Sequence, residues 1–266
     1  MKLMLTNYTI KLGDKYILIK IFLLYILMRE YKIVPPKDTN ENMFPVDPLL
    51  MELNFRMLMV ASSKSGKGVA LNNLLSDKFP YLKIFGKNIF LFSTSYSLGD
   101  PSLTNLQKYL PEENCFDKLD LQVLKELLQE QKRHILQFGK ENCVPLLFIF
   151  DDILTSVNNT KTNDIVREIW FSGRHYLINT IMCIQMFRGI SKAVRVNSTH
   201  MLLWNIENSI ERKTLIEEMP CESKLFLKIL DHATDEPFSF LKVNLKERDK
   251  NKRFQLRFTD QYYQLE

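Results

Sequence analysis

A short apolar segment that leads directly into a glycine-containing turn constrains the fold of this chain most. The segment is RMLMVA, from Arg56 to Ala61; the turn SSKSGKG and the helix-like run VALNNLL follow it. Further apolar runs of strand length occur at 88–93, 146–150, 180–184 and 201–204. Stretches with apolar residues at helical spacing, 121–138 and 164–171, lie between them. Because these apolar runs carry almost no polar residues, they are typical of strands covered on both faces. The sequence therefore predicts an α/β fold with a central, mostly parallel sheet.

The C-terminal part departs from this alternation. Residues 238–244 and 254–258 have the composition of two strands, and the charged stretch 246–253 separates them. Two strands around a short polar connection indicate a β-hairpin. We expect this hairpin to be added to the edge of the sheet.

The turn after the first apolar run has the residue types of a phosphate-binding loop. It comprises Ala61, Ser62, Ser63, Lys64, Ser65, Gly66, Lys67 and Gly68, and Val69 continues into the predicted helix. Between a strand and a helix N-terminus, such a loop directs backbone N–H groups at the phosphates of a nucleotide such as ATP. Gly66 permits close approach of the backbone, and Lys67 is expected to reach the β- and γ-phosphates.

Two positions differ from the usual pattern G-x-x-x-x-G-K-[ST]. Ala61 replaces the first glycine, which is a mild change because a small residue still fits. Gly68 replaces the serine or threonine whose hydroxyl binds Mg²⁺, which is a serious one. On its own, the loop would also be compatible with a flexible turn.

A second motif follows about 80 residues later. The segment PLLFIFDD, from Pro145 to Asp152, is an apolar strand that ends in two carboxylates, as in the Walker B motif of P-loop ATPases. Asp151 is expected to hold Mg²⁺, and Asp152 to polarise the attacking water as a general base. Gln185, at the end of TIMCI, is placed to contact the γ-phosphate or that water. A turn or helix cap at the Asp-Asp pair, and a surface glutamine, are the alternatives.

The order of four segments resembles a known family. ASSKSGKG, LLFIFDD, SGRHYLINTIMCIQ and ISKAVRVNSTHMLLW occur in the order found in viral genome-packaging ATPases of the FtsK/HerA superfamily, in the poxvirus-type branch that also occurs in virophages and Polinton-like elements. The resemblance covers about residues 45–245. It implies a P-loop NTPase fold of the ASCE/RecA-like kind, with ATP and Mg²⁺ as cofactors.

The resemblance also implies a function and partners. Such enzymes move double-stranded DNA into a capsid as a homo-oligomeric ring, here of five or six subunits, with a capsid or portal protein as a further partner. In such rings an arginine completes the neighbouring subunit's site, and Arg174 and Arg195 are the candidates. Either arginine is also compatible with a phosphate contact or with a surface ion pair. The implied location is inside the host cell, in the nucleus or a cytoplasmic virus factory, with association with the virion left open.

Residues 1–48 are predicted to form an N-terminal apolar segment with a proline-rich linker, and residues 49–266 the ATPase domain. The apolar run Tyr16–Met28 has 13 residues and includes Lys20, whereas a membrane-spanning helix needs about 20 apolar residues. We therefore expect it to pack on the domain, and no membrane partner is expected. An N-terminal anchor is the alternative.

The remaining features are less specific. The net charge of +5 permits a polyanionic partner without requiring one, and the basic residues of 242–257 are compatible with a DNA-tracking hairpin or with a solvated turn. The four cysteines and four histidines lack metal-ligand spacing, so the cysteines are read as reduced, mostly buried thiols.

Besides a packaging motor, Gly68 leaves open a nucleotide-binding scaffold subunit without catalysis. A small-molecule kinase is disfavoured because no acceptor-binding cluster follows residue 93.

Overall fold

The computed structural model describes residues 46–96, 98–99, 103, 106, 108–153 and 160–265, with side chains from 164 onward in the last range. These residues belong to one compact unit, Asn42–Glu266. The segment and linker predicted for residues 1–48 lie almost entirely outside the described residues, and the run Tyr16–Met28 lies wholly outside them. Among the described helices, none is both long and apolar enough to cross a membrane.

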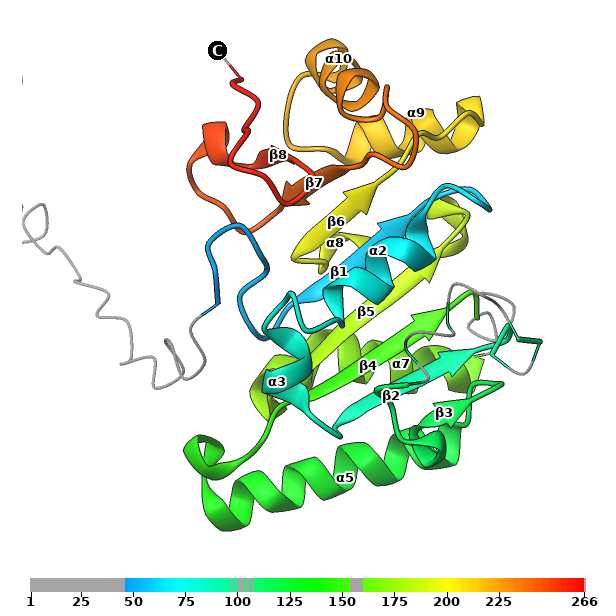
Figure 1. Cartoon of the computed structure of the whole chain (residues 1–266), viewed down its shortest axis with the longest axis vertical. Helices are drawn as coiled ribbons and strands as arrows, with labels where there is room; N and C mark the ends of the chain where they lie inside the picture. The colour runs from blue at the N-terminus through cyan, green and yellow to red at the C-terminus, as the bar shows by residue number, and fades with distance from the viewer. Residues whose placement is uncertain are drawn as a thin grey trace, which may run out of the picture. The chain divides into compact units, whose positions relative to one another are not determined.

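An eight-stranded sheet, in the order β3-β2-β4-β5-β1-β6-β7-β8, runs through the described part of the chain (Figure 1). The strands are β1 Arg56–Val60, β2 Ile89–Ser93, β3 Cys115–Phe116, β4 Leu146–Asp151, β5 Ile178–Ile184, β6 His200–Leu203, β7 Leu241–Asn244 and β8 Phe254–Leu256. β1 to β6 pair in parallel, whereas β7 is antiparallel to β6 and β8 to β7. This arrangement confirms the predicted parallel core and the C-terminal hairpin at its edge.

Helices cover both faces of the sheet. The α-helices are α2 Lys67–Leu74, α3 Tyr81–Phe85, α5 Leu121–Phe138, α7 Thr160–Ser172, α8 Lys192–Val196, α9 Ser209–Glu218 and α10 Ser223–Ala233; short 3-10 helices are η1 Glu112–Asn114, η2 Lys140–Asn142, η3 Gly173–Tyr176, η4 Phe187–Gly189 and η5 Lys250–Lys252. α5 occupies the range predicted for it. Its N-terminus is fixed by Asp120, whose carboxylate accepts hydrogen bonds from the amides of Gln122 and Val123.

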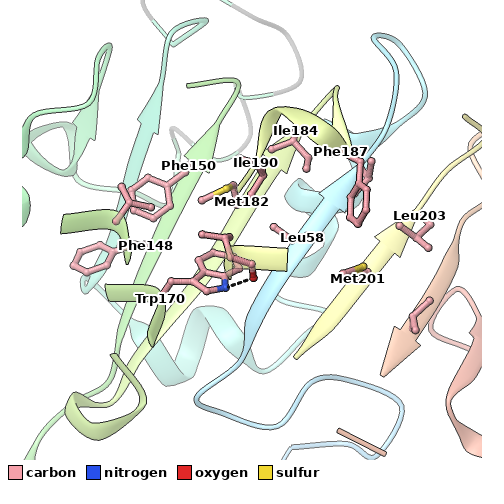
Figure 2. Packing of buried hydrophobic residues seen from close by; sticks show 14 of the residues in the cluster. Leu58, Phe148, Phe150, Trp170, Met182, Ile184, Phe187, Ile190, Met201 and Leu203 are labelled. Atoms are coloured by element: carbon pink, nitrogen blue, oxygen red, sulfur yellow. Dashed lines mark hydrogen bonds between the residues drawn. The ribbon is translucent and has the colours of Figure 1, made fainter. Parts of the chain in front are cut away.

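Alternate residues of each strand enter two different apolar cores. Leu58 of β1 packs with α5 and α7 to α10 on one face, whereas its neighbour Met57 packs with α2 and α3 on the other. Figure 2 shows the first core, where Phe148 and Phe150 lie beside Trp170. The indole of Trp170 is buried and donates a hydrogen bond to the carbonyl of Val194 (3.0 Å). Burial on both faces explains why the strands lack polar alternation.

The helix α7 ends at Ser172, and Gly173 begins the 3-10 turn η3. The left-handed residue is Leu177, with φ 54°. A Cβ on Gly173 would lie 3.2 Å from the Cβ of Ile178, so close packing accounts for this glycine.

Candidate active site

The P-loop turn leaves the carboxyl end of β1 and enters the N-terminus of α2. The amide of Ala61 donates to the carbonyl of Ile184 (3.1 Å), which ties the start of the turn to β5. Lys64 and Gly66 have positive φ angles of 63° and 95°, and Gly66 precedes the first residue of α2. Glycine adopts this conformation without a steric penalty. The turn therefore presents the amides at the beginning of α2, which lack intrahelical partners, toward a bound anion.

Lys67 lies at the first position of α2 and forms an ion pair. Its Nζ is 3.0 Å from Oδ1 of Asp152, and only 11% of its side chain is exposed. Burial disfavours the charged ammonium, but the neighbouring carboxylates of Asp152 and Asp151 outweigh this effect and raise the pKa of Lys67. The lysine therefore carries its charge at neutral pH.

Gln185 joins the same cluster from the end of β5. Its Nε2 donates to the other carboxylate oxygen of Asp152, Oδ2, at 3.0 Å. β5 lies between β1 and β4, so the carboxyl ends of three parallel strands meet at one edge of the sheet, where their arrowheads point in Figure 1. The structure thus brings together Lys67, Asp152 and Gln185, three residues that the sequence singled out separately.

Asp151 lies beside this cluster and has a partner that sequence reasoning missed. The carboxylate is buried, and its Oδ2 accepts a hydrogen bond from the hydroxyl of Ser93 (3.0 Å). Ser93 ends β2 and is paired in register with Asp151. The only sequence signal is that a hydroxyl residue terminates the apolar run NIFLFS. Adjacent parallel strands bring their final residues together, which explains the contact.

The donor set at this edge fits a magnesium ion held jointly with a nucleotide. Mg²⁺ in phosphate sites takes one or two carboxylates, substrate phosphate oxygens and several waters. Asp151 supplies a carboxylate, whereas Gly68 supplies no hydroxyl. Among the described residues, no group of three or more His, Cys, Asp or Glu side chains forms a complete protein cage for a metal.

The two candidate arginines have different environments. Arg195 is buried, and its guanidinium forms a bidentate ion pair with Glu218, with Nε–Oε2 and Nη2–Oε1 distances of 2.9 and 2.6 Å. Its Nη1 also donates to the carbonyls of Phe187 and Ile190, and the ring of Phe187 lies 4.9 Å from the guanidinium carbon. Through these contacts Arg195 holds η4 and α8 against α9. The geometry therefore argues against Arg195 as the arginine that completes a neighbouring subunit's nucleotide site.

Arg174 is exposed and lies at the opposite edge of the sheet from the P-loop. It belongs to η3, just before the amino end of β5, whereas Gln185 follows the carboxyl end of that strand. The seven residues of β5 span about 20 Å at about 3.3 Å per residue. Arg174 therefore cannot reach the nucleotide site of its own subunit.

The basic C-terminal segment is not uniformly solvated. Lys242 is buried, and its Nζ donates to the backbone carbonyls of Leu49 (2.6 Å) and Leu50 (3.3 Å). Burial lowers the pKa of Lys242 to about 8. Lys242 therefore belongs to neither a DNA-tracking nor a solvated turn, because it is buried on β7. Lys246, Arg248 and Lys250 lie beyond the strand and are exposed.

The cysteines are free thiols with unequal burial. Cys143 and Cys183 are buried, whereas Cys115 and Cys221 are only half-buried. Burial, together with the carboxylate of Asp151, raises the pKa of Cys183 well above its ordinary value. The thiol beneath the cluster is therefore neutral.

This strand order, with β5 between the P-loop strand and the strand that leads into the two aspartates, defines the fold of a P-loop NTPase. Residues 41–243 match the model of the family described as Poxvirus A32 protein, so the chain belongs to this family. It is 26% identical over 175 residues to the DNA packaging protein OPG160 of Variola virus and to that of Vaccinia virus (strain Western Reserve). The match covers 66% of this chain and 62% of each relative, so the chain spans less than two thirds of their length.

Solved structures share the fold at low sequence identity. The genome packaging NTPase B204 from Sulfolobus turreted icosahedral virus 2, in complex with AMP, superposes with a TM-score of 0.52 and 15% identity, over 73% of this chain and 94% of that one. ATPases 2 and 3 of EssC from Geobacillus thermodenitrificans give 0.53 and 15%, over 72% and 38%. These similarities establish the fold.

Proposed function

We propose that this protein hydrolyses ATP to move double-stranded DNA into a viral capsid, and that it acts as a homo-oligomeric ring of five or six subunits. The observation that carries the proposal is the convergence of Lys67, Asp152 and Gln185 at the P-loop. The relatives in Variola and Vaccinia virus are DNA packaging proteins, which supports DNA as the polymer that ATP hydrolysis moves.

Each residue of the cluster has a separate task in this proposal. The amides of the P-loop and Lys67 bind the phosphates, and ATP binding exchanges the Lys67–Asp152 ion pair for a lysine–phosphate contact. Asp152, thus released, accepts a proton from the attacking water, and Gln185 orients that water. Asp151, fixed by Ser93, is the expected ligand of Mg²⁺. A bound Mg²⁺ ion would neutralise charge that develops on the phosphates.

Arg174 is the proposed trans-acting residue. It is exposed and lies at the opposite end of β5, a strand about 20 Å long, from the P-loop, so it can act only on a neighbour's nucleotide. A guanidinium there would stabilise transition-state charge. Mixing Arg174→Ala with Lys67→Ala subunits tests this: each variant alone should be inactive, whereas mixed rings should regain partial hydrolysis because some sites receive an intact Lys67 and a neighbour's Arg174. Mixtures that stay inactive would contradict it.

The central experiment is ATP hydrolysis with and without double-stranded DNA. We expect DNA to stimulate the rate, and Lys67→Ala and Asp152→Asn each to abolish it. Lys78→Ala and Asp77→Asn are matched controls, because both residues are exposed in the turn after α2. Robust turnover by either active-site variant would refute the assignment.

A second candidate is a nucleotide-binding scaffold subunit without catalysis, and Gly68 is the observation that favours it. It predicts ATP binding with no measurable hydrolysis. Gly68→Thr distinguishes the two: a large gain in rate would show that the missing hydroxyl limits catalysis, whereas an active wild type unaffected by the change would refute this second candidate.

Further partners and the location complete the proposal. A capsid or portal protein would anchor the ring, and the proposed location is a virus factory or the nucleus of the host cell. The exposed cations Lys246, Arg248 and Lys250 are available for DNA phosphates. Replacing all three with glutamine should weaken DNA stimulation and its salt dependence while leaving basal hydrolysis unchanged.

A further inference from the structure

An exposed phenylalanine lies directly against the P-loop. Phe238, between α10 and β7, is 68% exposed and has a positive φ of 66°. A Cβ placed on Gly66 would lie 3.0 Å from the Cβ of Phe238 and 3.1 Å from its ring. A large apolar side chain in water and a left-handed backbone conformation are both unfavourable, so packing within the subunit does not explain this residue.

The segment that carries Phe238 is held in place from beneath. The indole Nε1 of Trp204 donates to the carbonyl of Phe238 (3.2 Å), and Trp204 itself is buried. The amide of Trp204 donates to the carbonyl of Val60 at the end of β1 (3.1 Å), so this segment and the P-loop are attached to the same strand end. The phenylalanine is therefore positioned relative to the phosphate site rather than free to move away.

A hollow of about 300 Å³ lies between these two parts. Its walls are two residues of the P-loop, the turn after β6 and the segment before β7; they comprise Lys64, Ser65, Trp204, Asn205 and residues 234–239. One side is thus continuous with the phosphate-binding turn. The segment before β7 contributes Phe238 and two acidic residues, Asp235 and Glu236, of which Glu236 also pairs with Arg257 (3.3 Å). These are the groups that a nucleoside requires: a flat apolar surface for the base and acceptors for hydroxyl or amino groups.

We propose that this hollow binds the base and ribose of the nucleotide, with the ring of Phe238 stacked on the base. The inference rests on the proposed function, which places the phosphates on the P-loop, and it assigns the remainder of the same ligand. Contact between Phe238 and Gly66 then also couples base binding to the conformation of the loop.

The test compares ligands with and without a base. Equilibrium binding of ATP and of inorganic tripolyphosphate is measured for the wild type, Phe238→Ala, Phe238→Leu and Phe238→Trp. Base–aromatic stacking contributes about 1–3 kcal/mol, so Phe238→Ala and Phe238→Leu should weaken ATP binding at least about 5-fold. Tripolyphosphate binding should change less than about 2-fold, and Phe238→Trp should retain the wild-type preference for ATP. Phe138→Ala is the matched control, because Phe138 is a half-exposed phenylalanine at the distant end of α5.

The outcomes separate this inference from the proposed function. Equal weakening of both ligands by Phe238→Leu would overturn the stacking role, because it would show that Phe238 acts only by supporting the P-loop. Unchanged ATP binding in Phe238→Ala would overturn it too. Neither result contradicts the assignment of the phosphates to the P-loop, whereas a wild type that binds neither ligand would refute the proposed function along with the inference.

Discussion

Replacing Arg195 tests whether this arginine supports the fold or acts on a neighbouring subunit. Arg195→Met keeps much of the aliphatic bulk but removes the guanidinium. It leaves the carboxylate of Glu218, whose side chain is only 17% exposed, without its cation. The carbonyls of Phe187 and Ile190 also lose a donor.

The expected loss of stability is large. Breaking a buried ion pair on one side costs about 3–5 kcal/mol, against a total of about 5–15 kcal/mol for a folded domain. With urea slopes of about 1–3 kcal/mol/M, the unfolding midpoint should fall by at least about 1 M. The double variant Arg195→Met/Glu218→Leu should be less destabilised than the sum of the single changes, because it leaves no unpaired charge.

Urea unfolding followed by circular dichroism measures these values. Arg174→Met is the matched control, since the same substitution at an exposed arginine should change the free energy of unfolding by less than about 0.5 kcal/mol. A wild-type midpoint for Arg195→Met, combined with lost ATP hydrolysis, would refute the structural role and restore Arg195 as a candidate for the trans-acting arginine.

Three further predictions concern single contacts. Burial lowers the pKa of Lys242 from 10.5 to about 8, so between these pH values the unfolded state binds more protons than the folded state. The free energy of unfolding of the wild type should therefore rise by up to about 3 kcal/mol from pH 8 to pH 10.5. Urea titrations at these two pH values should show the rise in the wild type and not in Lys242→Met. Gly66→Ala should reduce ATP affinity at least 10-fold, since its Cβ meets Phe238 at 3.0 Å and φ is 95°; unaltered affinity would show that the loop adapts. Ser93→Ala should raise the Mg²⁺ concentration needed for half-maximal hydrolysis, and Ser93→Thr should restore it, whereas an unchanged Mg²⁺ dependence would exclude positioning of Asp151 by this hydroxyl.

Local sequence patterns accounted for most of the sheet and for the longest helix. The runs that predicted β1, β2, β4, β5 and β6 are uninterrupted apolar segments, and α5 has apolar residues at helical spacing with Asp120 as its cap. These signals are local, because burial on both faces favours apolar residues at most strand positions. The helices α9 and α10 had no such prediction, although Asn208 caps the first of them.

In the candidate site, too, the sequence identified residues that belong to local motifs and missed those that depend on distant contacts. Short motifs singled out Lys67, Asp152 and Gln185, and in the structure Lys67 and Gln185 each lie within hydrogen-bond distance of Asp152. Ser93 and Phe238 were missed because their importance comes from neighbours far away in the sequence, Asp151 and Gly66 respectively. A serine at a strand end and a phenylalanine in a loop carry no distinguishing signal by themselves.

Arg174 and Arg195 show which properties of this protein follow from the sequence and which follow only from the tertiary structure. By itself, the sequence determined the alternating α/β fold, the P-loop and the acidic strand, because strand burial and phosphate binding depend on residues close together in the chain. It assigned Arg174 and Arg195 the same candidate role. Only the tertiary structure separated them: it pairs Arg195 with Glu218 on α9 and leaves Arg174 exposed at the far edge of the sheet. The charge of a side chain is fixed by its residue type, but its availability depends on which distant segments fold against it.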